Sequence, residues 1–153
     1  MRLPVICGGL ALAFTAGLFA ADVVPHAWAQ AGRAVMAPQI VNLFTMTEDE
    51  IGPLRPGADL RSRTLVDTEH GTVAIQSGNV MKHFHADADE IQLILDGTGS
   101  FWLGEREMQI KPGDLVIIPR GTAHAGSRAA TGRFRAVAIK LPPQRPDDVH
   151  PVP

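Results

Sequence analysis

Short apolar segments follow one another at close, even spacing from Gly71 onward, and each ends at turn residues. Pro112-Gly113 suits a type II turn, because proline fixes the first central φ and glycine accepts the positive second one. Many short strands at such intervals, with no long helical pattern, predict an all-β sandwich or barrel. The expected strands are TVAIQS, VMKHFH, EIQLIL, SFWL, EMQI, LVII, TAHAG and FRAVAIKL.

Residues 30–70 form a less regular N-terminal segment. Residues 40–44 are apolar and predict a short edge strand, and a second strand is predicted over residues 60–66. Between them, Thr47 and Glu50 have the spacing of a helix capping box, in which each side chain binds the other residue's backbone N–H. Gly52-Pro53 would end this helix after about one turn. The segment is therefore expected to contain one short helix and edge strands.

The barrel core is predicted over residues 71–141. Residues 142–153, PPQRPDDVHPVP, form a proline-rich tail. Proline cannot donate a backbone hydrogen bond, so the tail is unsuited to a central strand. We expect it to lie over the surface or to be mobile. His150 lies in this tail, and no functional role is assigned to it.

The first 29 residues have the layout of a secretory signal peptide. Arg2 precedes an uncharged run over residues 3–21, and Ala27-Trp28-Ala29 is a small-x-small cleavage pattern. The alternative is an uncleaved membrane anchor, since the run is close to spanning length, but its glycines disfavour a stable span. We expect cleavage after Ala29, no membrane span afterwards, and a periplasmic or secreted protein.

Composition narrows the classes of function. The chain has 153 residues, 45% hydrophobic and 20% charged, which is typical of one globular domain. Its net charge of −2 argues against nucleic acid as a partner, because phosphate binding needs a basic surface. Tyrosine is absent, so no phenol can act as acid or base. Cleavage would remove Cys7, the single cysteine, leaving only nitrogen and oxygen ligands for a metal.

The stretch KHFHADADE places two histidines one residue apart and a carboxylate five positions after the second. His83 and His85 lie on one face of the predicted strand, roughly 7 Å apart along it, because side chains alternate between faces. Met81 shares that face. A hairpin-length link then brings Glu90 to the start of the next strand, with Gln92 following on the inward face as a candidate pocket residue.

His124 follows a proline-glycine turn in PRGTAH, at the start of another predicted strand. Three imidazoles and one carboxylate that converge at one end of a small β structure resemble the ligand set of a divalent transition metal. Such a set leaves two positions of an octahedral ion open, and an open position distinguishes a catalytic from a structural site. Surface histidines without a metal are the alternative reading of these residues.

These residues resemble the two motifs of the cupin superfamily, small β-barrels in which three histidines and one glutamate bind a metal. The first motif lies in GNVMKHFHADADEIQLILDG and the second in GDLVIIPRGTAH. The matching positions are Gly78, His83, His85, Glu90 and Gly97, then Gly113, Pro119, Gly121 and His124. The resemblance implies a single-domain cupin-like β-barrel of the double-stranded β-helix or jelly-roll type.

Two positions depart from the family pattern without touching the ligands. The gap from Gly78 to His83 is one residue shorter than usual. Arg128 stands four positions after His124, where asparagine is frequent, and is expected to place a cation near the mouth of the site. Trp102 is expected in the core, with the pocket wall as its alternative place. His70, beside Gly71, is expected to be solvent-exposed.

Three classes of function stay open. The first is a metal-dependent enzyme acting on a small organic molecule, either as a dioxygenase or through non-redox decarboxylation, isomerisation or elimination. In such an enzyme Glu90 is both ligand and candidate catalytic residue. The second is a non-catalytic protein that binds a sugar or organic acid through the metal, and the third is a barrel that the metal only stabilises.

The resemblance implies one divalent iron, manganese, nickel, copper or zinc ion per subunit. The four-ligand set is similar to that of flavonol dioxygenases, germins and oxalate-metabolising cupins, whereas the cysteine dioxygenase branch usually lacks the glutamate. On the opposite face of the same strand, Ile91, Leu93 and Leu95 would point outward. This row needs a cover, either the N-terminal segment or a second subunit, so a homodimer is expected as an alternative.

Overall fold

The computed structural model describes residues 36–153. The predicted signal peptide and its cleavage site after Ala29 lie outside the described residues. Within residues 36–153, no helix has the length and apolar character needed to cross a membrane.

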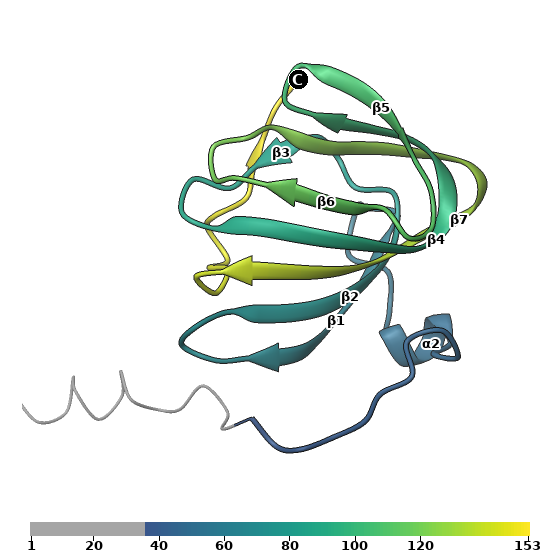
Figure 1. Cartoon of the computed structure of the whole chain (residues 1–153), viewed down its shortest axis with the longest axis vertical. Coiled ribbons are helices and arrows are strands. Elements are labelled where there is room, and N and C mark those ends of the chain that lie inside the picture. The colour runs from purple at the N-terminus through teal and green to yellow at the C-terminus, as the bar shows by residue number, and fades with distance from the viewer. Residues whose placement is uncertain (1–35) are drawn as a thin grey trace, which may run out of the picture. The chain divides into compact units, whose positions relative to one another are not determined.

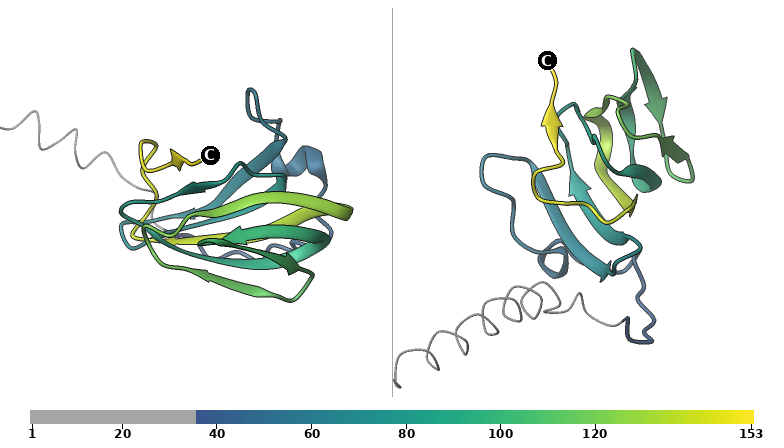
Figure 2. Two further views of the ribbon diagram at one scale, coloured as in Figure 1. Left: turned by 90° about the horizontal axis from the view of Figure 1, so that it is seen from above. Right: turned by 90° about the vertical axis from the view of Figure 1, so that its left-hand side faces the viewer.

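The described chain is a curled barrel of antiparallel strands, which confirms the expected all-β fold (Figures 1 and 2). One sheet path runs β1-β2-β7-β3-β8, and β4 joins β7 to β5 and β6. The strands are β1 Leu60–Asp67, β2 Thr72–Gly78, β3 His83–Phe84, β4 Asp89–Leu103, β5 Arg106–Ile110, β6 Leu115–Ile118, β7 His124–Leu141 and β8 His150–Pro151.

Strands β4 and β7 are longer than the sequence pattern predicts. EIQLIL and SFWL form one strand, β4, and TAHAG and FRAVAIKL form another, β7. The expected break around Gly97 is a run of register shifts in the β4–β7 pairing, and such bulges bend strands without ending them. The backbones of β4 and β7 approach closely here. A Cβ on Gly99 would lie 2.1 Å from the Arg128 carbonyl oxygen, so only glycine fits at this position.

The inward face of β4 divides the barrel interior into two ends. Glu90 and Gln92 are buried near the start of the strand, whereas Ile94 and Phe101 follow on the same side and belong to the apolar core. The core fills one end of the barrel and leaves the other end lined by polar groups. Its buried members are Ile94, Phe101, Ile110, Val116, Ile118, Ala125, Phe134 and Ala136.

The predicted capping box forms at the short helix α2 Glu48–Ile51. The Thr47 backbone N–H donates to the Glu50 carboxylate at 2.7 Å, and the Glu50 N–H donates to the Thr47 hydroxyl at 3.3 Å. Residues 40–44 are not the expected edge strand. The Asn42 side-chain oxygen accepts from the backbone N–H of Phe44, so the chain turns instead of extending.

The outward row of β4 is covered only in part. Leu95 packs on a second apolar cluster that contains Met46 and Ile51 from the N-terminal segment, as one of the two expectations for this row predicts. Leu93 remains exposed, beside Leu115 and Ile117 of β6. A homodimer across this exposed part stays a prediction.

Candidate metal centre

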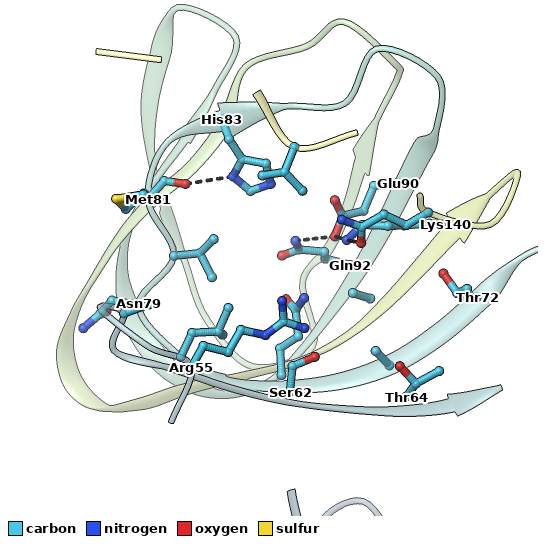
Figure 3. A pocket seen from close by; sticks show the side chains of 18 of the residues that line it. Arg55, Ser62, Thr64, Thr72, Asn79, Met81, His83, Glu90, Gln92 and Lys140 are labelled. Carbon is cyan, nitrogen blue, oxygen red and sulfur yellow. Dashed lines mark hydrogen bonds and ion pairs between the residues drawn. The ribbon is translucent and has the colours of Figure 1, made fainter. Parts of the chain in front are cut away.

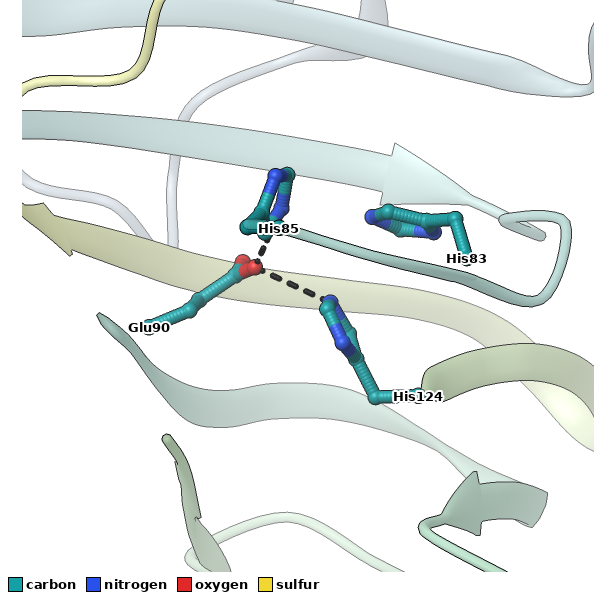
Figure 4. A group of neighbouring side chains, drawn as sticks. All are labelled: His83, His85, Glu90 and His124. Carbon is teal, nitrogen blue, oxygen red and sulfur yellow. Dashed lines mark hydrogen bonds and ion pairs between the residues drawn. The ribbon is translucent and has the colours of Figure 1, made fainter. Parts of the chain in front are cut away.

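The four predicted ligands converge at the polar end of the barrel (Figure 4). One ligand atom from each residue lies within 4.8 Å of the others, and all four residues are buried. His83 on β3 pairs in register with His124, the first residue of β7. His85 follows β3 directly, and Glu90 is the second residue of β4.

Backbone carbonyls orient all three imidazole rings. The Nδ1–H of His83 donates to the Met81 carbonyl at 2.8 Å, and that of His124 donates to the Thr122 carbonyl at 2.9 Å. The Nδ1–H of His85 donates to the Asp148 carbonyl. Because each proton sits on Nδ1, each Nε2 keeps a lone pair for a metal, the arrangement common among metal-binding histidines.

Glu90 faces these lone pairs. Its Oε2 atom lies 3.1 Å from Nε2 of His85 and 3.1 Å from Nε2 of His124. The carboxylate and these two lone pairs repel one another. Burial and the neighbouring His124 lower the pKa of His83 to about 4, so the third ring is neutral at pH 7 and also offers a lone pair. A divalent cation between the four groups would remove the repulsion. The donor set therefore fits a transition metal held by nitrogen and oxygen.

The other oxygen of Glu90 is held from the cavity side. Gln92 Nε2 donates to Glu90 Oε1 at 2.8 Å, and the Lys140 ammonium lies 3.7 Å from the same atom. Burial alone would raise the pKa of Glu90, but the pKa is lowered, because His124 and His85 donate to the carboxylate whenever their Nε2 atoms carry protons and because Lys140 is positively charged. The carboxylate is therefore ionised and keeps Oε2 turned to the imidazoles.

Lys140 is a site residue that motif matching misses. Burial lowers its pKa, Glu90 opposes that shift, and Arg55 adds to it. The strand pattern could have revealed it, because Lys140 lies two and four positions after Ala138 and Ala136, which face the interior.

Asp148 is a second missed residue, and it corrects the expectation that the tail lies loosely on the surface or is mobile. Its side chain is 1% exposed, and its carboxylate accepts hydrogen bonds from the backbone N–H groups of Ala86, Asp87 and Ala88. Its carbonyl fixes the His85 ring. Three N–H hydrogen bonds to one carboxylate anchor the tail. Nothing in the local sequence around Asp147-Asp148 indicates that Asp148 binds the backbone of residues 86–88.

The tail then pairs with the ligand strand. In β8, Pro151 pairs with His83 and His150 pairs with Phe84. The His150 ring also stacks on Phe84, with 4.8 Å between ring centroids. His150 thus packs behind the ligand strand, where the sequence gave it no role.

A cavity of about 390 Å³ opens beside the ligands (Figure 3). Its lining includes His83, Glu90, Gln92 and Met81. Gln92 and Met81 thus lie beside the ligands, where the sequence predicted pocket residues. Trp102 and Arg128 line a different hollow. Trp102 pairs with Ala125 and Arg128 pairs with Ser100, so both residues lie where the end of β4 meets the start of β7.

The barrel and its buried three-histidine, one-glutamate set define the class of protein: an antiparallel double-stranded β-helix with a cluster able to hold a metal. Residues 70–140 match the model of the cupin domain family. The barrel core over these residues is therefore a cupin domain.

Sequence relatives are matched over a short segment. The chain is 41% identical over 59 residues to an acireductone dioxygenase of Rhodopseudomonas palustris (strain TIE-1), which covers 36% of this chain and 35% of that protein. It is 44% identical over 48 residues to the acireductone dioxygenase of Drosophila pseudoobscura pseudoobscura, covering 28% and 25%. The chain thus spans about a third or less of the length of these curated relatives.

Solved structures share the fold at low identity. An uncharacterized conserved protein with a double-stranded β-helix domain from Klebsiella pneumoniae gives a TM-score of 0.57 at 17% identity, covering 69% of this chain and 91% of that one. KdgF from Halomonas sp. gives 0.52 at 18% identity, covering 58% and 83%.

Removing a ligand should remove the metal. We expect His83→Ala or His124→Ala to lower the metal content well below one ion per subunit. Each variant keeps only three of the four ligands and loses one imidazole that is oriented toward the site. Elemental analysis of the purified variants checks this. His70→Ala, whose side chain is 86% exposed, should keep the wild-type metal content. Full metal in the two ligand variants would refute the assignment.

The metal-free protein should lose stability in acid. The pKa of His83 is lowered from 6.5 to about 4, so below pH 6.5 the unfolded chain binds a proton that the folded chain does not. Stability is therefore complete above pH 6.5 and falls as the pH drops towards 4. Thermal unfolding of chelator-treated protein across this range measures it. His83→Asn should flatten the dependence of stability on pH, and the exposed control His70→Asn should leave it unchanged. Equal pH profiles in the two variants would show that His83 does not cause the dependence.

Asp148→Ala should weaken metal binding although Asp148 is no ligand. Without its carboxylate the tail loses its anchor on residues 86–88, and the His85 ring loses a fixed carbonyl partner. Loss of such supporting contacts typically costs about 10–100-fold in metal affinity. Competition with a chelator measures this, and Asp147→Ala is the matched control, since that side chain is 76% exposed. Wild-type affinity in both variants would exclude a supporting role.

Proposed function

We propose that the protein is an exported, metal-dependent enzyme that acts on a small organic molecule, with dioxygenase chemistry as the reaction class. The observation that carries the proposal is the opening of the ligand cluster onto a cavity of about 390 Å³. That volume lies within the range of small-molecule sites, which is about 300–1,000 Å³. A substrate in this cavity would lie against His83 and Glu90.

The cavity favours a catalytic over a structural site. Structural metals are closed off by their protein ligands, whereas catalytic metals keep a position open. A bound transition metal would supply Lewis acidity or redox chemistry at that position. The surrounding residues have distinct roles: backbone carbonyls orient the three rings, and Gln92 and Lys140 hold the Glu90 carboxylate in its ionised form.

The acireductone dioxygenases that match part of this chain support oxygen chemistry over the non-redox alternatives. The match covers about a third of their length or less, so their substrate is not carried over. The leader-like pattern of residues 1–29 supports export, and the single divalent ion per subunit could be iron, manganese, nickel, copper or zinc.

Oxygen consumption tests the proposal. We expect the iron-loaded protein to consume oxygen with at least one member of a panel of phenols, flavonols and small organic acids. Glu90→Gln should lower the rate by at least about 100-fold, because the neutral amide cannot supply the ligand charge. Glu107→Gln on β5, an exposed glutamate, is the matched control. Turnover that persists without metal, or no uptake with any compound, would count against a dioxygenase.

A further inference from the structure

Two cations outside the ligand set face the same cavity (Figure 3). Lys140 comes from the end of β7 and is buried beside Glu90. Arg55 comes from the loop between α2 and β1, and its side chain extends into the cavity from the opposite wall. The loop itself is hydrogen-bonded: the Arg55 N–H donates to the Leu60 carbonyl at 2.8 Å, and the Ala58 N–H donates to the Arg55 carbonyl at 3.1 Å.

Both cations have donors to spare. The Lys140 ammonium donates to the Gln144 side-chain oxygen at 2.6 Å and lies 3.7 Å from Glu90 Oε1. An ammonium has three N–H donors, so one remains. The Arg55 guanidinium has five donors, and within residues 36–153 none of them reaches an acceptor or a carboxylate.

Two carboxylates, Glu90 and Asp67, also line the cavity. Glu90 is turned to the imidazoles, where a divalent cation would add more positive charge than Glu90 removes. Asp67, the other acidic residue of the lining, has an interaction of its own. With a divalent metal bound, the lining would therefore carry a net positive charge, which favours an anionic ligand.

The remaining walls suit a compact, oxygen-bearing molecule. Strands β1 and β2 contribute neutral hydrogen-bonding side chains, and apolar side chains from several elements complete the lining. The polar members are Ser62, Thr64, Thr72 and Gln76, and the apolar ones include Leu60, Val80, Ala138 and Val149.

We infer that this cavity binds a small organic carboxylate, whose carboxylate group is held between Arg55 and Lys140 while its remaining oxygens face the metal ligands. The inference rests on the proposed function and deepens it by naming the substrate class. A guanidinium fork matches the two oxygens of a carboxylate. A phosphate ester fits less well, because no helix N-terminus lines the cavity to supply backbone N–H groups.

Calorimetric titration of the metal-loaded protein with two probe pairs tests this: malate against malamide, and salicylate against salicylamide. Within each pair the amide has nearly the same size and shape as the acid but is neutral, and each carboxylate loses one acceptor oxygen to an NH2 donor. We expect the acid of at least one pair to bind about tenfold more tightly than its amide, as charge-assisted hydrogen bonds allow. Arg55→Ala should weaken acid binding about tenfold and leave amide binding unchanged. Arg55→Lys should recover part of the loss.

Two further variants separate the causes. Lys140→Met should also weaken acid binding, and its metal content is measured alongside because Lys140 lies near Glu90. Arg106→Ala on β5 is the matched control, an exposed arginine outside the cavity, and should bind as the wild type does.

The outcomes distinguish this inference from the proposed function. Equal binding of acid and amide in both pairs, an Arg55→Ala variant with wild-type affinity, or preference for glycerol 1-phosphate over both acids would overturn the carboxylate assignment and leave the metal enzyme standing. Failure to bind metal would overturn the proposed function. The acid-to-amide ratio measured with metal-free wild type and Arg55→Ala would then still decide the present inference.

Discussion

The whole site depends on the electrostatic balance around one buried carboxylate. Glu90 is 1% exposed and faces the Nε2 atoms of two imidazoles. These atoms carry no proton, because the proton of each ring is on Nδ1 and donates to a backbone carbonyl. Taking such a charge out of water is costly unless opposite charge compensates it. Lys140 compensates one oxygen from the cavity side, and a divalent cation would compensate the other. The rest of the barrel holds these groups in place.

The barrel achieves this by separating its two ends. Along the inward face of β4, polar side chains give way to Ile94 and Phe101, so apolar packing at one end supports the polar site at the other. Two peripheral segments complete the structure. The segment around α2 covers part of the outer face, and the tail closes behind the ligand strand through Asp148. The tail is thus part of the metal centre, although it contributes no ligand.

Fold and chemistry carry different information here. The double-stranded β-helix is shared with solved structures at 17–18% identity, and such a fold hosts many reactions. The features specific to this chain lie outside the two cupin motifs. Arg55, in the loop after α2, and Lys140, at the end of β7, bring two cations to the cavity and thereby bear on the class of substrate.

The sequence by itself determined the all-β class, the capping box at Thr47 and the four ligands, because each depends on local spacing: alternation along strands, turn residues, and two compact motifs. It could not locate Arg55, Lys140 or Asp148 in the site. The groups that they face lie far away in the chain, as in the 62 residues that separate Ala86 from Asp148. Only the curled barrel decides which distant side chains meet around the site, since such contacts arise from packing in three dimensions. For the same reason, the sequence did not locate Trp102 and Arg128: Trp102 was expected in the core or on the pocket wall and Arg128 at the mouth of the site, but both line a separate hollow.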